Sequence, residues 1–343
     1  MTRLTFLIGN GFDLNVGLNT KYRDFYDYYI SNHPDDMLAK AIEENYVYWS
    51  DLELGLGRCT KNIKEEDEEA FWHSEENLEE ELRTYLKSEM ERVNIKNDER
   101  KRETAIEMQR SLTEFQRELP EVQRKHIKII FDRIMEGIEY SFITFNYTKV
   151  LDQCISATRE VIRVDFGKHN VGGRTFDDII GDVLHIHGAT DTDMVLGVND
   201  EEQIANKEFI KNPSYRQILI KEETNRRLDN GKIEEARKMI DESVILCTFG
   251  ISIGSTDRMW WQYICEWLRK DGERRLIIFI KVEKEEGKKG IGKYTLFTRQ
   301  DEMLDRLKTN AGMSDEAWNG IKGQVYVKCN AEIFNFKIVD KKL

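Results

Sequence analysis

The sequence predicts an α/β fold in which a Rossmann-like parallel sheet is flanked by helices and carries a charged α-helical insertion. In the second half of the chain, short apolar runs rich in β-branched residues alternate with helix-like stretches, a pattern typical of buried parallel strands joined by helical crossovers. A similar apolar run opens the chain and ends in Gly-Asn-Gly at residues 9–11. Residues 62–138 are instead dense in Glu, Lys and Arg, with apolar residues at helical spacing.

The chain length of 343 residues suits one large domain or two smaller ones. We expect residues 1–61 to hold the first strand, a nucleotide loop and helices of the α/β core. Residues 62–138 form the helical insertion, whose default interpretation is a solvated helical surface, and residues 139–343 complete the core. Pro120 predicts a break between two helices of the insertion.

The individual elements follow from the hydrophobic patterns. Strands are expected at 3–8, 140–146, 161–166, 182–188, 193–198, 243–250, 275–282 and 324–328. Helices are expected at 20–31, within 62–138, and at 202–240, 256–271 and 298–321.

Composition narrows the class of protein. The net charge of −12 argues against a general binder of nucleic acid or of anionic membranes. No apolar run approaches the roughly 18 residues that cross a bilayer, and the N-terminus lacks the cleavage site of a signal peptide. The five cysteines are scattered and never form a CxxC pair, which predicts reduced thiols and no zinc site. We therefore expect a cytoplasmic protein without a membrane partner or a metal.

Polar clusters follow four of the predicted strands, where an open α/β sheet binds its ligands. In the first cluster, Gly9 and Gly11 allow a phosphate to approach the backbone, and a helix start would offer free N–H groups. The pattern departs from GxGxxG because position 14 is Leu. Asp13 would repel a pyrophosphate, so it has to face a sugar, cap a helix or pair with an arginine such as Arg23. A turn without a ligand stays open as an alternative.

The second and third clusters contain Asn146 and two histidines. The Asn146 amide both donates and accepts, so it can orient a water or a ribose hydroxyl; taken alone, it is better explained as a helix cap. His185 and His187 stand two apart and share one side of a strand, but no other ligand stands at metal-binding spacing. A single working base, His187, before Gly188 fits better, and His185 is then a satisfied core histidine.

The fourth cluster spans residues 249–257. Gly250 and Gly254 open the turn, while Ser252 and Asp257 supply a hydroxyl and a carboxylate. The tryptophans of the following helix are expected in the core. A further aromatic and acidic group, Trp49 with Asp51 and Glu53, stands in a region without predicted strands, and its acids are expected to be ordinary exposed surface acids.

Together these stretches resemble a known family, the bacteriophage abortive infection AbiH family. The resemblance rests, in chain order, on LIGNGFDLNVGLNTKYRDF (7–25), WSDLE (49–53), FITFNYT (142–148), HIHG (185–188), LGVND (196–200) and FGISIGSTD (249–257). It covers nearly the whole chain. It implies a protein of bacterial defence against phage.

The same landmarks in the same order also resemble the wider group of sirtuin-like (SIR2) NAD-binding domains. Gly9 and Gly11 match that group's loop glycines, Asn146 its asparagine that contacts ribose and water, and His187 its catalytic histidine. Gly250 and Ser252 match its late turn. The chain departs from the group at Asn10, Asp13 and Thr148, and it has no zinc-binding cysteine quartet.

This resemblance implies a SIR2-like pocket with NAD as substrate. It implies His187 and Asn146 as the catalytic residues. The loop 9–13 would hold the pyrophosphate, and Ser252 and Asp257 would contact the adenine-side sugar. The residues expected to bind the nucleotide are Gly9, Asn10, Gly11, Phe12, Asp13, Arg23, Thr144, Tyr147, Gly188, Gly250, Ser252 and Asp257.

The resulting hypothesis is an NAD+ hydrolase (an NAD glycohydrolase) whose activity depletes the NAD of an infected cell. Three alternatives stay open. The protein is a nucleotide-binding sensor or scaffold without catalysis, a metal-dependent nuclease toxin that uses carboxylates such as Glu53, or a structural partner that binds through residues 62–138. The expected partners are a nucleotide, a phage-derived trigger or another defence protein, and a second copy of the chain.

Overall fold

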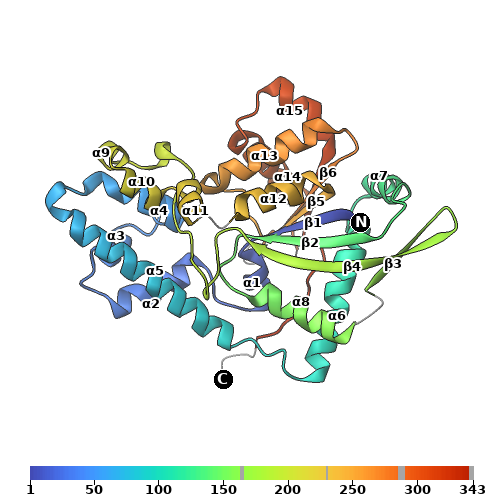
Figure 1. Cartoon of the computed structure of the whole chain (residues 1–343), viewed down its shortest axis with the longest axis horizontal. Coiled ribbons are helices and arrows are strands. Elements are labelled where there is room, and N and C mark those ends of the chain that lie inside the picture. The colour runs from blue at the N-terminus through green and yellow to red at the C-terminus, as the bar shows by residue number, and fades with distance from the viewer. Residues whose placement is uncertain (163–165, 229–230, 285–289, 340–343) are drawn as a thin grey trace.

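The computed structural model describes residues 1–162, 166–228, 231–284 and 290–339, and its centre is a seven-stranded sheet with the order β3-β4-β2-β1-β5-β6-β7 (Figure 1). The strands are β1 (Thr2–Ile8), β2 (Ile138–Thr144), β3 (Gly167–Val171), β4 (Arg174–His185), β5 (Ser243–Phe249), β6 (Arg275–Ile280) and β7 (Val325–Cys329). From β4 across to β7 all neighbours pair in parallel. The expected α/β fold with helices around a sheet is therefore confirmed.

The expectation of a wholly parallel sheet is wrong at one edge. β3 pairs antiparallel with β4 as a hairpin, and its two turn residues, Gly172 and Gly173, both have positive φ. A two-residue turn of this kind matches the twist of the flanking strands. The hairpin extends β4 well before the strand expected at 182–188.

Two expected strands do not form as predicted. Val161 is the last residue of a helix rather than the start of a strand, and residues 163–165 of the expected strand 161–166 lie outside the described residues. The segment 193–198 runs as a loop whose one ladder contact is a bridge between Val198 and Ile220. This loop is buried, and burial explains why its apolar run looked like a strand.

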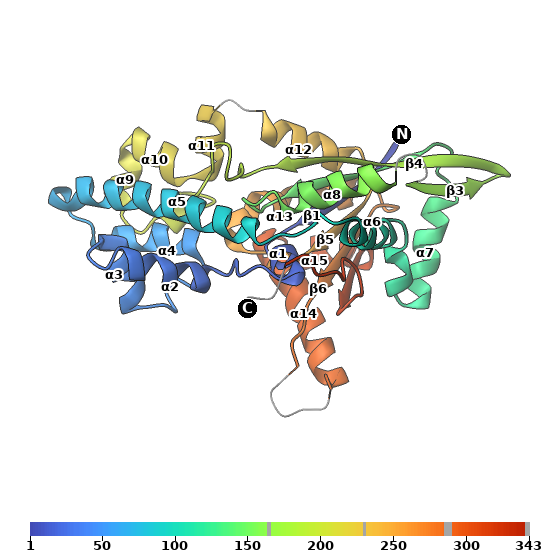
Figure 2. The same ribbon diagram turned by 90° about the horizontal axis from the view of Figure 1, so that it is seen from below.

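Helices cover both faces of the sheet (Figures 1 and 2). β1 carries apolar side chains on both faces, and these need such cover. Leu4, Phe6 and Ile8 point to one core and Leu7 to the other, as the alternation of a strand requires. The first core includes residues of α1 (Gly11–Val16), α6 (Asp98–Thr113), α7 (Glu121–Phe131) and α8 (Val150–Val161). The second includes residues of α12 (Lys232–Asp241), α13 (Arg258–Lys270), α14 (Lys293–Asn310) and α15 (Asp315–Ile321). The tryptophans of α13 lie in the second core, as expected.

A third hydrophobic cluster forms a helical lobe beyond the carboxyl ends of the strands (Figure 2). Its aromatic centre includes Phe25, Tyr29, Trp49 and Phe71. The lobe consists of α2 (Tyr22–Asn32), α3 (Met37–Glu44), α4 (Leu52–Cys59), α5 (Glu68–Glu91), α9 (Lys207–Lys211), α10 (Pro213–Leu219) and α11 (Lys221–Leu228).

The charged stretch 62–138 contributes helices both to the helical lobe and to the layer that covers the sheet. Its first helix, α5, packs in the helical lobe, whereas α6 and α7 pack on the sheet. Pro120 directly precedes α7, so the expected break is confirmed. The short 3-10 turns are η1 (Thr60–Asn62), η2 (Glu65–Asp67), η3 (Phe115–Glu118), η4 (Glu201–Gln203), η5 (Ser255–Asp257) and η6 (Lys322–Gln324). In the described part of the chain, no helix combines the length and the apolarity that crossing a membrane requires.

Candidate functional site

A cavity of about 550 Å³ lies where the parallel strands end. We call it the carboxyl-edge cavity. The loops after β1, β2, β4 and β5 form one side of it, and the helical lobe closes the other through residues such as Tyr22, Glu53 and Tyr85. The cavity therefore lies between the sheet and the lobe, where an open α/β sheet binds ligands.

The glycines of the first and fourth loops pack against each other. The Gly11 N–H donates to the Gly250 carbonyl at 2.9 Å, and a Cβ on Gly11 would lie 2.4 Å from the Gly250 Cα. Gly9 is equally close, because its Cβ would meet the Gly250 carbonyl oxygen at 2.6 Å. Gly250 also has a φ of +71°, which favours glycine. The loop–loop contact thus explains why all three positions are glycine.

Replacing Gly250 with alanine is expected to lower the free energy of unfolding by about 3 kcal/mol or more, because strain at positive φ adds to a backbone clash. Chemical denaturation monitored by circular dichroism measures this change. The matched control is Gly320→Ala, whose Cβ would meet no atom within 4 Å and which lies in helix α15. Equal stability of the two variants would contradict the explanation.

His187 and Asp257 form a buried pair on the cavity wall. The His187 Nε2 lies 3.0 Å from the Asp257 Oδ1, and His187 is 5% exposed. Burial lowers the pKa of His187, and the nearby Lys221 lowers it further. The neutral imidazole therefore donates from Nε2 to the carboxylate, which leaves Nδ1 as an acceptor. Nδ1 is buried without a hydrogen-bond partner.

Lys221 links this pair to the helical lobe. Its Nζ lies 2.8 Å from the Asp257 Oδ1 and 2.7 Å from the Glu53 Oε2. Burial opposes ionisation of Asp257, but Lys221 and His187 outweigh it and hold the pKa of this carboxyl well below its usual value. Burial raises the pKa of Glu53 to about 7, although Lys221 favours its ionised form. The four side chains form one charged network that spans the sheet and the lobe.

The Tyr147 hydroxyl and the Asp51 carboxyl lie near Glu53 on the wall of the cavity. The Tyr147 hydroxyl lies 3.4 Å from the Glu53 Oε1 and donates to the Val195 carbonyl at 3.1 Å. Asp51 caps α4 by accepting from the Leu54 N–H, and burial raises the pKa of its carboxyl. The wall thus carries several carboxylates within a largely desolvated space, where charges interact strongly.

Asn146 and Asp13 lie side by side along the end of β2. The Asn146 Nδ2 donates to the Gly9 carbonyl at 3.2 Å, and the Thr148 hydroxyl donates to the Asp13 Oδ2 at 2.6 Å. The other carboxyl oxygen of Asp13 is buried without a hydrogen-bond partner. Burial raises the pKa of Asp13 to about 7, against the opposing effects of Thr148 and Asn146.

The comparison with known families decides the relationship. The model of the family described as bacteriophage abortive infection AbiH matches residues 5–279. The chain belongs to this family. No curated protein matches the chain. The match covers the sheet up to β6 and all of the loops that line the cavity after β1, β2, β4 and β5.

Most residues predicted for the site of this AbiH protein lie together. The carboxyl-edge cavity is lined by Gly9, Asn10, Gly11, Asp13, Asn146, Tyr147, His187, Gly250, Ser252 and Asp257. Phe12 is buried in the first core, and the Thr144 hydroxyl donates to the Ile8 carbonyl. Gly188 packs against Asp193, and the exposed Arg23 lies over the Tyr46 ring. These last four residues do not line the cavity.

The structure changes the interpretation of the acids near Trp49. The expectation of exposed surface acids is wrong for Glu53, which is 5% exposed. Trp49 is buried against Gly55, where a Cβ would lie 2.3 Å from the indole. This packing orients the start of α4 so that Glu53 reaches Lys221. Lys221 itself was not predicted, since nothing in its charged stretch distinguishes it from the surface lysines nearby.

The two histidines do not share one side of a strand as expected, because β4 ends at His185 and His187 lies in the turn that follows. The His185 Nε2 lies 2.9 Å from the Asp152 Oδ2, and its Nδ1 lies 3.2 Å from the Asn146 carbonyl oxygen. Both ring nitrogens are therefore engaged, as expected for a satisfied histidine. In the described parts of this AbiH protein, no group of three or more His, Cys, Asp or Glu side chains is placed to hold a metal ion.

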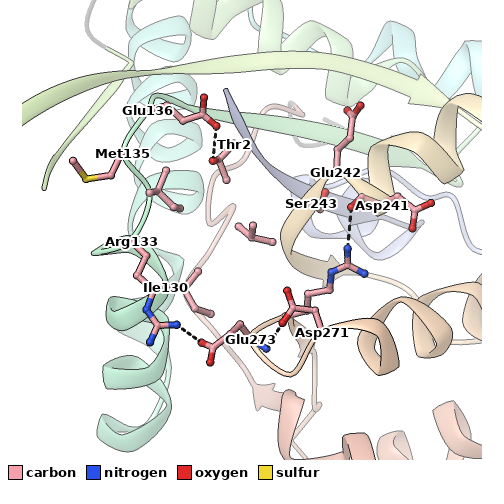
Figure 3. Close-up of a pocket in the computed structure, with 13 residues that line it drawn as sticks. Thr2, Ile130, Arg133, Met135, Glu136, Asp241, Glu242, Ser243, Asp271 and Glu273 are labelled. Carbon is pink, nitrogen blue, oxygen red and sulfur yellow. Dashed lines mark hydrogen bonds and ion pairs between the residues drawn. The ribbon is translucent and has the colours of Figure 1, made fainter.

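A second hollow of about 540 Å³ lies at the opposite, amino ends of the strands (Figure 3). Its charged side chains are engaged within the protein. Arg133 pairs with Glu273 at 2.8 Å, and the Thr2 hydroxyl donates to Glu136 at 2.9 Å. None of the residues predicted for the site lines this hollow, so the carboxyl-edge cavity is the candidate site of the AbiH protein.

Asp13 is expected to make stability depend on pH. Its pKa is raised from 3.8 to about 7, so the folded protein retains a proton that the unfolded chain releases. The contribution of Asp13 to stability is therefore largest at low pH and falls as pH rises from about 4 to about 7, by up to about 4 kcal/mol. Asp13→Asn removes this contribution, so urea denaturation should show the variant gaining on the unmodified protein between pH 5 and pH 7.5. The exposed Asp182→Asn control should show a constant difference, and a constant difference for Asp13→Asn would contradict the assignment.

Proposed function

We propose that this AbiH protein hydrolyses the nicotinamide–ribose bond of NAD in the carboxyl-edge cavity, through a SIR2-like arrangement of loops. The observation that carries the proposal is the buried His187, held by Asp257, whose Nδ1 has no partner within the protein. A polar atom desolvated in this way costs free energy unless a ligand engages it. Its position on a cavity wall supports a role toward a bound molecule.

The reaction needs charge stabilisation more than acid catalysis. The C1′–N bond breaks with its electron pair moving to the pyridinium nitrogen, so nicotinamide leaves as a neutral molecule. The ribose then carries the positive charge of an oxocarbenium-like state. When they are ionised, the carboxyl groups of Asp257, Glu53 and Asp51 on the cavity wall carry more negative charge than the one Lys221 cation neutralises. This excess negative charge would stabilise such a cation.

His187 acts as the general base in this mechanism. A water attacks C1′ from the face opposite the departing nicotinamide and transfers its proton to the His187 Nδ1, which gives ADP-ribose, nicotinamide and one released proton. Asp257 fixes the tautomer and orientation of the ring through Nε2 and stabilises the imidazolium that forms. The lowered pKa of His187 keeps the base neutral and ready at pH 7.

The volume of the cavity and its other lining residues fit the remaining parts of a dinucleotide. The volume of about 550 Å³ lies within the usual range of about 300–1,000 Å³ for ligand sites. Asn146 lies between His187 and the first loop, where its amide can orient the ribose or the water. Ser252 and the exposed Lys281 line the cavity near the end of β6. Lys281 supplies positive charge there for the pyrophosphate.

The family membership supports the biological setting. Abortive infection stops the growth of an infected cell, and loss of NAD would have that effect. We infer that the activity is held in check until a phage-derived component or another defence protein releases it. Binding of NAD without cleavage would instead favour a sensor.

The direct test is release of nicotinamide from NAD by the purified protein, prepared both from uninfected and from phage-infected cells. Asn146→Ala is expected to lower the initial rate at least about tenfold, because the substrate loses its orientation. Asn170→Ala, on the β3–β4 hairpin, is the matched control and should retain the full rate. Absence of nicotinamide from both preparations would contradict the proposal.

A further inference from the structure

Asp13 is an acid of the cavity wall that lies outside the Lys221 network. It lies on α1 and is 1% exposed. Its Oδ2 accepts from the Thr148 hydroxyl at 2.6 Å, whereas its Oδ1 is buried and has no partner. Asp257 and Glu53, in contrast, both contact Lys221.

A buried carboxyl oxygen without a donor is costly, and native proteins nearly always satisfy such groups. Burial raises the pKa of Asp13, whereas Thr148, Asn146 and His185 lower it. The effect of burial is the larger one, so the protein does not fully offset the cost of burying this carboxyl. Asp13 is one of the residues that line the carboxyl-edge cavity. A donor from a bound molecule would satisfy its Oδ1.

We propose that Asp13 is a specificity-determining residue that accepts a hydrogen bond from an uncharged donor of the bound dinucleotide and rejects an anionic group at the same position. The inference rests on the proposed function. Of the uncharged donors of NAD, the carboxamide of nicotinamide and the 2′-hydroxyl of the adenosine ribose are the two that an anionic group replaces in related dinucleotides, so we assign the donor to one of these two positions. At a pH above the raised pKa of Asp13, about 7, a carboxylate or a phosphate in either place would meet the Asp13 carboxylate and be repelled.

A second observation favours an uncharged group beside Asp13. The first loop uses its glycines for contact with Gly250, since Cβ atoms on Gly9 and Gly11 would clash with that backbone. These glycines therefore do not need a phosphate to explain them. Among the described residues that line the cavity, Lys281, directly after β6, is the Lys or Arg side chain that supplies positive charge. The pyrophosphate is accordingly placed toward Lys281, and a neutral part of the ligand toward Asp13.

Calorimetric titration at about pH 8.5, where the Asp13 carboxyl is ionised, tests the inference with three ligands: NAD, nicotinic acid adenine dinucleotide and NADP. The two analogues carry an anionic group in place of the carboxamide donor or of the 2′-hydroxyl. The His187→Gln protein is used throughout, so that binding is measured without turnover. It is compared with the same protein carrying Asp13→Asn, Asp13→Ser or, as a control, the exposed Asp182→Asn.

Asp13→Asn and Asp13→Ser are expected to reduce the preference for NAD over one analogue by at least about tenfold, while Asp182→Asn preserves it. Loss of discrimination against the nicotinic acid dinucleotide identifies the carboxamide as the donor, and loss against NADP identifies the hydroxyl. If both Asp13 variants keep the original preference for NAD over the two analogues, the role of Asp13 is overturned while the hydrolase proposal stands. Binding of NAD without cleavage by the protein with intact His187 would overturn the hydrolase instead, and failure to bind any dinucleotide would overturn both.

Discussion

Replacing His187 with glutamine is expected to slow nicotinamide release from NAD by about 10²–10⁴-fold, the range that a general base contributes. Glutamine retains a polar group of similar reach but cannot take a proton from water. The substitution leaves Asp257 paired with Lys221, so the folded structure should persist. Initial rates at saturating NAD, with circular dichroism as a check on folding, measure the effect.

His185→Gln is the matched control for this prediction. His185 is the last residue of β4, two residues before His187, but its ring pairs with Asp152 and the Asn146 carbonyl. Its loss should change the rate far less than the loss of His187. The rate of the unmodified protein should also rise with pH through a pKa below 6.5 and then level off, because burial lowers the pKa of His187 and the base must be neutral. Equal rates for the two variants would contradict the role of His187.

Lys221→Met is expected to lower the free energy of unfolding at pH 7.5 by about 3–5 kcal/mol, the usual effect of removing one partner of a buried ion pair. Lys221 is 5% exposed and lies within 2.8 Å of both Glu53 and Asp257. Its loss leaves the negative charge of Asp257 without its Lys221 partner, and it removes the ion pair that links Glu53 to Asp257 through Lys221. Urea denaturation of the purified variant measures this change.

Two controls separate the network from the loss of any lysine. Lys238→Met removes a lysine that is 72% exposed and 3.9 Å from Glu242, and it should alter stability by less than about 1 kcal/mol. Adding Asp257→Asn to Lys221→Met should restore part of the loss, because it removes the stranded charge. A Lys221→Met protein as stable as the Lys238→Met protein would show that the network does not hold the lobe to the sheet.

The sequence alone predicted the central strands well because their side chains are covered on both faces. β1, β2, β5, β6 and β7 are near-continuous apolar runs, and such runs are a direct consequence of burial between two helical layers. The β3–β4 hairpin was missed because its strands are polar and half-exposed. Its signal in the sequence is Gly172-Gly173 between two extended stretches, which is a recognised hairpin turn.

The site residues that follow strands could be predicted from the sequence. Those on helices of the lobe could not. Asn146, His187 and Asp257 follow strands, and parallel pairing brings such positions to one edge. Lys221 and Glu53 come from α11 and α4, whose approach depends on the packing of Trp49 and the rest of the lobe core. No local pattern reveals that approach. The pairing of Asp257 with His187 likewise depends on how two loops turn after leaving the sheet.

The structure of the His187→Gln protein bound to NAD tests the central claim most directly, because the substrate should remain uncleaved. The account predicts the dinucleotide in the carboxyl-edge cavity, with C1′ of the nicotinamide ribose beside residue 187 and Asn146. It also predicts the pyrophosphate near Lys281. NAD bound in the hollow at the amino ends of the strands, or a well-folded protein that shows no NAD at saturating concentration, would contradict the account.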